Sequence, residues 1–184
     1  MKDSSLFLSS FIKDPTQVGA IAPSSRFLTR EIIKNIDFSS SKNIVELGPG
    51  LGTFTKAILR KANTDARLVC FEVNASFRGY LAKNLADKRM HVTSESAEKL
   101  SSTLKKLKIK ANCIVSGLPF KNFPLQKRKK ILGEIRDSLG KNARFILLQY
   151  TNDLRPLLDS YFKKVSRSFV PLNMPPAFVF VCEN

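Results

Sequence analysis

The sequence predicts an α/β fold built on a mostly parallel sheet of seven strands. Short runs rich in β-branched residues alternate along the chain with longer segments whose apolar residues recur at helical spacing. This alternation is typical of strand–helix–strand units, in which each helix returns the chain to the start of another parallel strand. The chain has 184 residues with no internal repeat or low-complexity linker, so we expect one domain over residues 1–184.

The predicted strands and helices alternate in order along the chain. Strand-like runs lie at residues 43–47, 67–72, 90–93, 111–116, 144–149, 164–170 and 177–182. Amphipathic segments between them predict helices at residues 54–62, 75–86, 97–107, 125–139 and 153–162. Two further helices are predicted before the first strand, at residues 5–12 and 26–36. Residues 171–176 are too few for a crossover helix, so the last strand is expected to be antiparallel.

The charge of the chain is strongly one-sided. Lys and Arg number 31 against 15 Asp and Glu, which gives a formal net charge of +16. Such a field attracts polyanions, either nucleic acid or an anionic membrane surface. Eleven of the basic residues lie between Lys99 and Arg136, against the single acid Glu134. This basic stretch predicts a docking face, for which a bilayer and RNA remain alternatives at this point.

Several features exclude other classes of protein. No apolar run approaches the roughly 18–20 residues that a membrane-spanning helix needs, and we expect a cytoplasmic protein because no signal-peptide core is recognisable. Cys70, Cys113 and Cys182 are far apart and odd in number, which predicts buried free thiols. The single histidine, His91, excludes a His-rich metal cluster and argues against a Ser-His-Asp triad, so no metal is expected.

The most informative stretch is a glycine-rich loop between a buried strand and a helix. Gly48, Gly50 and Gly52 let the backbone turn sharply and approach a ligand closely. Because Thr53 follows the last of these glycines, the spacing is G-x-G-x-G and differs from the dinucleotide fingerprint. Glu46 precedes the loop, where it would repel a pyrophosphate but suits the cationic amino-acid end of S-adenosylmethionine (SAM).

Acidic and polar residues at other strand ends extend this prediction. Glu72, with Val73 beside it, ends the second strand at the position from which a carboxylate accepts hydrogen bonds from ribose hydroxyls. Glu95 and Ser96 follow the third strand, where they either contact the adenine amino group or form an ordinary helix cap. The predicted cofactor-binding set is completed by Ser25 and Ser116. Together these features predict a Rossmann-like class I SAM-dependent methyltransferase; the alternative is a generic strand–helix turn beside a solvated Glu72.

Four segments carry a resemblance to a known family. They are FIKDPTQVGAIAPSSR at 11–26, the glycine-rich loop, VSGLPF at 115–120 and NMPPA at 173–177. Together they resemble the bacterial phospholipid N-methyltransferases, which methylate phosphatidylethanolamine with SAM towards phosphatidylcholine. The resemblance implies a SAM-binding core at 43–184 and a helical segment at 1–36 that lies on the inner face of the membrane. The chain is also similar to the rRNA adenine dimethylases, in the loop and the Leu-Pro-aromatic element.

The Leu-Pro-aromatic element distinguishes these two families. Base-amine methylases usually place Asn or Asp before it, whereas this chain has Gly117 followed by Leu118, which favours a primary alkylamine over adenine. Phe120 is expected to pack over the methyl group or methylated ammonium, or else only to turn the chain. Tyr150, at the end of the fifth strand, is predicted to bind the headgroup or relay a proton; the alternative is a packing role.

The remaining predictions concern the lipid. Lys13, Arg26 and Lys121 are candidates for its phosphate, and Asn173 is expected to close the pocket from the final hairpin. An apolar cluster within residues 6–12 predicts an amphipathic interfacial helix, with a core helix as the alternative. The expected partners are an anionic membrane surface and a phospholipid, with the protein a monomer. A SAM-binding module without catalytic activity is a further possibility.

Overall fold

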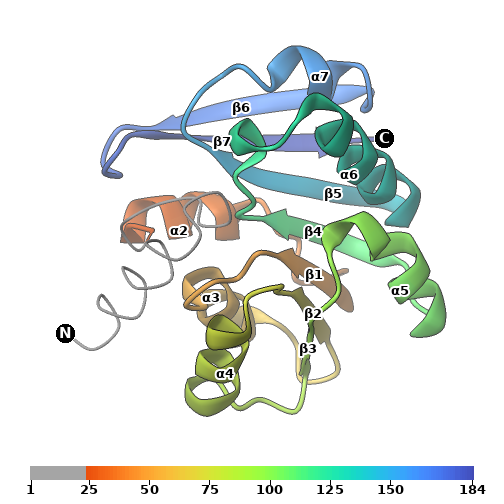
Figure 1. The fold of residues 1–184 in the computed structure, drawn as a ribbon. Helices are drawn as coiled ribbons and strands as arrows, with labels where there is room; N and C mark the ends of the chain where they lie inside the picture. Colours follow the sequence, from red (N-terminus) through yellow and green to blue (C-terminus); the bar gives the residue numbers. More distant parts are fainter. Residues whose placement is uncertain (1–23) are drawn as a thin grey trace.

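A single seven-stranded sheet organises the part of the chain that the computed structural model describes, residues 24–184 (Figure 1). The strands lie in the order β3-β2-β1-β4-β5-β7-β6. Their bounds are β1 Asn43–Leu47, β2 Arg67–Phe71, β3 Met90–Thr93, β4 Ala111–Ser116, β5 Leu139–Gln149, β6 Lys164–Val170 and β7 Ala177–Glu183. The first five strands are parallel, and β7 runs antiparallel to both β5 and β6. The predicted fold class and antiparallel last strand are confirmed.

The helices also follow the predicted order. Their bounds are α2 Arg26–Lys34, α3 Thr53–Lys61, α4 Ala75–Asn84, η1 Ala97–Lys99, α5 Leu100–Lys106, η2 Phe120–Asn122, α6 Leu125–Ser138 and α7 Arg155–Asp159. The helix predicted at 97–107 is divided into η1 and α5, and α7 is shorter than predicted. Strand β5 begins five residues earlier than predicted, at Leu139. The predicted helix at 5–12, its apolar cluster and Lys13 lie outside the described residues.

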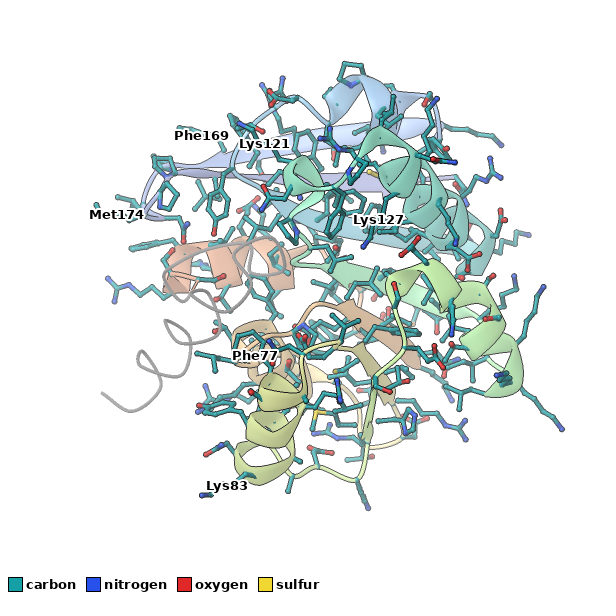
Figure 2. The ribbon with its side chains drawn as sticks, viewed as in Figure 1. Phe77, Lys83, Lys121, Lys127, Phe169 and Met174 are labelled. Atoms are coloured by element: carbon teal, nitrogen blue, oxygen red, sulfur yellow. The ribbon has the colours of Figure 1, made fainter. Side chains whose placement is uncertain are left out.

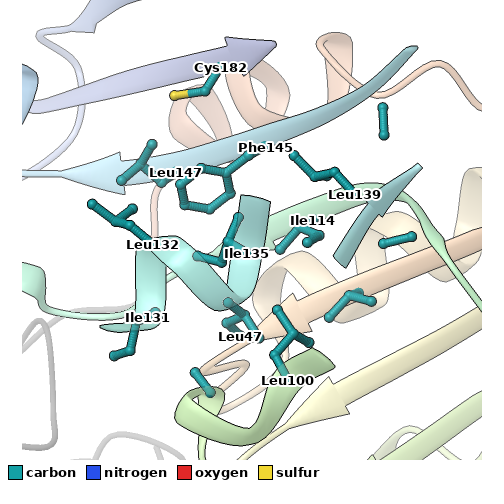
Figure 3. Packing of buried hydrophobic residues seen from close by; sticks show 14 of the residues in the cluster. Leu47, Leu100, Ile114, Ile131, Leu132, Ile135, Leu139, Phe145, Leu147 and Cys182 are labelled. Atoms are coloured by element: carbon teal, nitrogen blue, oxygen red, sulfur yellow. The ribbon is translucent and has the colours of Figure 1, made fainter. Parts of the chain in front are cut away.

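Two hydrophobic layers form the core, one on each face of the sheet. Alternation along β1 sends Ile44 toward the layer beneath α2 and α3, and Val45 and Leu47 toward the layer beneath α5, α6 and α7. Figure 3 shows the second layer, in which Phe145 of β5 packs near Ile135 of α6. Both faces are covered, as parallel sheets require, and the strand ends are left to form a site.

Helix α2 is fixed to the sheet at its N-terminal end. The Oγ atom of Ser25 accepts the Leu28 N–H at 3.2 Å and caps the helix. The Ser25 N–H donates to the Oδ1 atom of Asn173 at 2.9 Å, which ties the start of α2 to the β6–β7 hairpin. Within residues 24–184, no helix is long and apolar enough to cross a membrane. The three cysteines are buried and free, as predicted.

Candidate active site

A cavity of about 520 Å³ opens at the carboxyl ends of the parallel strands. Its walls come from the segments that follow β1, β2, β3, β4 and β5. Strand β1 lies between β2 and β4. The chain adds β2 and β3 on one side of β1 and then crosses to add β4 and β5 on the other side, so the strand order reverses at β1. Ligands of open α/β sheets bind at such a switch point. The cavity is therefore the candidate active site.

The glycine-rich loop forms the floor of this cavity. Gly48, Gly50 and Gly52 have φ values of 72°, 56° and 76°, in the left-handed region that favours glycine. A Cβ atom on Gly50 would meet nothing within 4 Å, so this residue leaves open space on the cavity side of the loop. A Cβ atom on Gly52 would lie 2.4 Å from the Cδ1 atom of Leu85. Gly50 thus serves the cavity, and Gly52 serves close packing against α4.

Glu72 is held rigidly at the cavity wall. Its Oε2 atom accepts the Gly50 N–H at 3.0 Å, and its Oε1 atom accepts the Asn74 N–H at 2.9 Å. Burial raises the pKa of this carboxyl, and the two backbone N–H groups partly offset the rise. Each carboxylate oxygen keeps a further lone pair. The side chain can therefore accept two more hydrogen bonds from a ligand in the cavity.

Glu46 lies beneath the loop and does not line the cavity. Its Oε2 atom accepts the Thr55 hydroxyl at 2.6 Å. Its Oε1 atom is buried and has no hydrogen-bond partner among the described residues. Burial raises the pKa of this carboxyl to about 7. The structure therefore places Glu46 behind the loop rather than at the ligand surface.

The predicted adenine-side residues separate in the structure. Ser96 lines the cavity, and its Oγ atom also accepts the Glu98 N–H at 3.3 Å as a helix cap. Glu95 does not line the cavity, and its Oε2 atom lies 3.0 Å from the Nζ atom of Lys99. Phe77 and Ala97 line this part of the cavity as apolar walls. Ser96 thus forms the helix cap that the sequence offered as one alternative and also lines the cavity, while its contact with adenine stays a prediction.

The segment after β4 approaches the glycine-rich loop closely. A Cβ atom on Gly117 would lie 3.1 Å from the Gly48 carbonyl oxygen, closer than most such contacts. The buried hydroxyl of Ser116 accepts the Leu118 N–H at 3.2 Å. The Nε2 atom of Gln149 donates to the Leu118 carbonyl oxygen at 3.0 Å. The lack of a side chain at Gly117 therefore also serves the close approach of two backbone segments.

The aromatic residue of this segment that lines the cavity is Phe123, not the predicted Phe120. Phe120 is fully buried and does not line the cavity, because its ring packs into the core layer of α6. Phe123 lines the cavity, and its ring lies edge-on to that of Phe120 with centroids 6.1 Å apart. The Nζ atom of Lys127 lies 4.7 Å from the centroid of the Phe123 ring. Of these two rings, the one that a ligand in the cavity can reach is that of Phe123.

Tyr150 lines the cavity from the end of β5. Burial raises the pKa of its phenol, and a hydrogen bond with Asn173 partly offsets this rise. Asn173 is buried behind Tyr150 and does not line the cavity; its Nδ2 atom donates to the Pro175 carbonyl oxygen at 2.7 Å. Tyr150 is thus a neutral hydroxyl group at neutral pH, with its position linked to the β6–β7 hairpin.

Comparison with known proteins identifies the family. No family model matches the chain. The ornithine lipid N-methyltransferase of Singulisphaera acidiphila is 30% identical over 187 residues, which span all of this chain and 97% of that protein. The chain belongs to the family of SAM-dependent lipid N-methyltransferases. The chain is accordingly a SAM-dependent N-methyltransferase.

Other similarities are local or concern the fold. Ribosomal RNA small subunit methyltransferase A of Legionella pneumophila is 33% identical over 58 residues, 32% of this chain and 22% of that protein. The N-methyltransferase NodS of Bradyrhizobium japonicum, solved with bound S-adenosyl-L-homocysteine, superposes with a TM-score of 0.68. It is 10% identical, and the match covers 87% of this chain and 88% of that one. A precorrin-6y C5,15-methyltransferase from Geobacter metallireducens has the same TM-score and 11% identity over 85% of this chain and 88% of that one.

The residues of this lipid methyltransferase fit SAM at the cavity. SAM carries a cationic amino acid, a ribose with two hydroxyls and a flat adenine. Gly50 leaves space above the loop, Glu72 offers two acceptor oxygens, and Phe77 and Ala97 provide apolar walls for a flat ring. The cofactor is S-adenosyl-L-methionine.

The structure brings ten of the predicted residues together around the cavity. They are Gly48, Gly50, Thr53, Glu72, Val73, Ser96, Gly117, Leu118, Lys121 and Tyr150. Eight others within the described part of the chain do not line it: Ser25, Arg26, Glu46, Gly52, Glu95, Ser116, Phe120 and Asn173. The lining residues that the sequence reasoning missed include Phe77, Ala97, Glu98, Phe123, Lys127 and Gln149. Figure 2 shows Phe77 on α4, Lys121 on η2 and Lys127 on α6. Only Gln149, a polar residue at the end of an apolar strand, had a recognisable sequence signal.

Proposed function

We propose that this enzyme transfers methyl groups from SAM to the primary amine of a membrane lipid. The observation that carries the proposal is the full-length similarity to a lipid N-methyltransferase, combined with a cavity built to bind SAM. Phosphatidylethanolamine is the acceptor that the sequence motifs favour. An ornithine lipid is the second candidate, because the full-length relative acts on that lipid.

One side of the cavity binds SAM, and the other side binds the acceptor amine. The glycine-rich loop and Glu72 hold SAM by the loop backbone and the ribose hydroxyls, with Ser96 and Ala97 beside the adenine. When bound, SAM supplies an electrophilic methyl group to a neutral amine. The residues after β4 and β5, including Leu118, Gln149 and Tyr150, hold the acceptor amine in line with that group. Alignment and exclusion of water supply most of the acceleration in such a transfer.

Tyr150 assists the amine rather than forming a covalent intermediate. An alkylammonium has no lone pair, so it must lose a proton before it can react. The neutral Tyr150 oxygen can accept a hydrogen bond from an N–H of the deprotonated amine and so orient its lone pair toward the methyl group. Lys121 and Lys127 also line the cavity, but Asp153 and Glu98 lie within 4.0 Å of them and partly balance their charge. The proton leaves to water at the cavity mouth.

The segment at Gly117 supports a lipid amine over a base amine. A base amine is held by a side-chain oxygen at this position in base methylases, and Gly117 offers none. The 3.1 Å approach to the Gly48 oxygen further restricts any side chain there. An alkylamine needs no such oxygen, because its lone pair is not delocalised into a ring.

A transfer assay with several acceptors tests this function. The protein is incubated with methyl-labelled SAM and vesicles that contain phosphatidylethanolamine, vesicles that contain an ornithine lipid, or ribosomal RNA. We expect label in a lipid fraction and none in RNA. Label in RNA alone would establish the adenine alternative. SAM binding without label in any fraction would indicate a module without catalytic activity.

A further inference from the structure

The exposed apolar side chains gather at one edge of the molecule. Within the described residues, six large hydrophobic side chains are exposed: Phe27, Val73, Leu125, Phe169, Leu172 and Met174. Every one lies at or just beyond the carboxyl ends of the parallel strands, or at the start of a helix on that edge. This is the edge where the cavity opens. The opposite edge of the described fold exposes none.

Four of these side chains form an apolar tip, defined here as Phe27, Phe169, Leu172 and Met174. Leu172 is 64% exposed and Met174 is 86% exposed. The bond from the Ser25 N–H to Asn173 brings the start of α2 to the hairpin that carries the other three residues. Figure 2 shows Phe169 and Met174 at the far end of that hairpin, beside α2. Exposed apolar side chains that gather at one end of a protein mark an interaction surface.

A basic groove adjoins the apolar tip. The groove, of about 870 Å³, lies between α2 and α3 and is lined by Arg26, Arg30, Lys34, Lys56, Arg60 and Lys61. No carboxylate of the described residues lines it. Lys34 lies 2.6 Å from Glu31, and the other five cations have no carboxylate within 4.0 Å in the described part of the chain. Ser24 lines both this groove and the active-site cavity, so the two are contiguous.

The basic stretch at 99–136 has a different environment. The folded chain places a carboxylate within 4.0 Å of five of its eleven cations, Lys99, Lys121, Lys127, Lys130 and Arg136. Lys127 and Lys130 both lie within 4.0 Å of Glu98, and Lys121 lies 4.0 Å from Asp153. In the α2–α3 groove five of the six cations have no such partner among the described residues, so the groove is the more one-sided anion-attracting surface.

We propose that the apolar tip and the basic groove together bind an anionic phospholipid bilayer, with the cavity opening toward the lipid. This inference rests on the proposed function, since a lipid acceptor must reach the cavity while its tails stay in the bilayer. A bilayer matches the surface because it offers apolar chains next to phosphates, within reach of a tip and a groove that share α2. RNA matches it less well, because the two most exposed side chains of the tip are Leu172 and Met174 rather than the phenylalanines, and they have no flat face on which bases stack.

Vesicle co-sedimentation with paired variants tests the proposal. The tip variant is Leu172→Ser with Met174→Ser, and the groove variant is Arg30→Glu with Lys56→Glu. The control is Lys141→Glu with Lys163→Glu, which changes net charge equally at the opposite, amino-terminal edge. We expect at least a tenfold loss of affinity for phosphatidylglycerol-containing vesicles in the tip and groove variants, and less than a twofold change in the control. At high salt the groove variant and the unaltered protein should bind equally, whereas the tip variant should still bind more weakly than either.

Thermal melting of each variant shows that it is folded, and three results would overturn the proposal. One is unchanged vesicle binding by both variants. Another is loss of binding in Lys105→Glu with Lys106→Glu while the groove variant binds normally, which would assign docking to the 99–136 stretch. A groove variant that loses binding to ribosomal RNA but not to vesicles would likewise contradict it.

A transfer assay in two lipid forms separates this inference from the proposed function. The tip variant should lose activity on vesicles but keep it on the same lipid dispersed in detergent micelles. Equal activity on vesicles would refute the docking surface and leave lipid methylation intact. Absence of transfer to lipid by the unaltered protein in both forms would refute the function, whatever the vesicle binding shows.

Discussion

At the residue scale, Glu46 is the most deeply buried acidic side chain of the described residues. It is 1% exposed, and one of its oxygens has no partner within the described fold. Its pKa is raised from 4.5 to about 7 by burial, so the folded chain holds this proton more tightly than the unfolded chain does. The associated stability is fully present below about pH 4.5 and is lost as pH rises through about 7. Its full size is on the order of 3 kcal/mol.

Glu46→Gln should remove this pH dependence. Near pH 5 the carboxyl is protonated and the amide is nearly isosteric, so the two proteins should have similar free energies of unfolding. At pH 8 the variant should be more stable by about 1–3 kcal/mol, because no charge is buried. Urea denaturation at the two pH values measures the change. A difference between variant and parent that is the same at both pH values would contradict the cause assigned here.

Glu72 carries the clearest prediction for the cofactor. Glu72→Ala should abolish the rise in melting temperature that SAM produces, because both acceptor oxygens at the cavity wall are lost. A ligand at about 100 times its Kd stabilises by about 2.7 kcal/mol, which is readily detected. Glu95→Ala is the matched control, since that carboxylate faces Lys99 outside the cavity. A normal thermal shift in Glu72→Ala would refute the ribose assignment.

At the element scale, the connection from β4 to α6 carries two aromatic residues with different roles: Phe120 packs in the core and Phe123 lines the cavity. Phe120→Ala should mainly destabilise the fold, by about 3–5 kcal/mol, because the ring is fully buried. Phe123→Ala should mainly lower methyl transfer, because that ring faces the cavity. Melting temperature and turnover, measured on both variants, separate the two effects. The reverse pattern would restore Phe120 as the aromatic residue next to the transferred methyl group.

The glycine-rich loop allows a similar separation. Alanine at Gly50 or Gly52 meets comparable strain, since both positions have positive φ. Only at Gly52 would the new Cβ atom also come within 3 Å of Leu81 on α4 and of Leu85 at its C-terminal end. Gly52→Ala should therefore have the lower melting temperature, and Gly50→Ala the greater relative loss of SAM affinity. Equal melting temperatures would show that α4 yields easily at this contact.

The elements themselves were predictable where one physical signal dominates. Buried β-branched runs mark the strands, and strand ends converge, so Glu72, Gly117 and Tyr150 could be placed at one site. The start of β5 could not be predicted, because Lys141 and Asn142 are polar and Asn142 adopts a positive φ of 59°. Phe120 and Phe123 could not be distinguished either. Which ring faces the cavity depends on how α6 packs, and this is a tertiary effect.

At the scale of the whole molecule, charges that are close together in the sequence are not always the ones that are close together in the folded protein. The stretch at 99–136 has a single acid in sequence, yet Glu98 and Asp153 lie against its cations once folded. The groove cations come from two separate helices, α2 and α3, and no local run of sequence marks them. The sequence therefore predicts the amount of charge well, but its one-sided concentration only emerges from the fold.

The positive charges concentrated in the groove should also lower the stability of the folded protein when no lipid is bound. Five groove cations without nearby carboxylates repel one another within a protein of net charge +16, and at low salt this repulsion reaches across the groove. Arg30→Glu with Lys56→Glu should relieve it. A gain of about 1 kcal/mol corresponds to a melting temperature higher by about 2–4 °C in a protein of this size. Calorimetry at 10 mM and 500 mM salt measures the gain, which should shrink as salt screens the groove. A melting temperature that falls in the variant, or a gain independent of salt, would show that these cations are compensated within the folded chain.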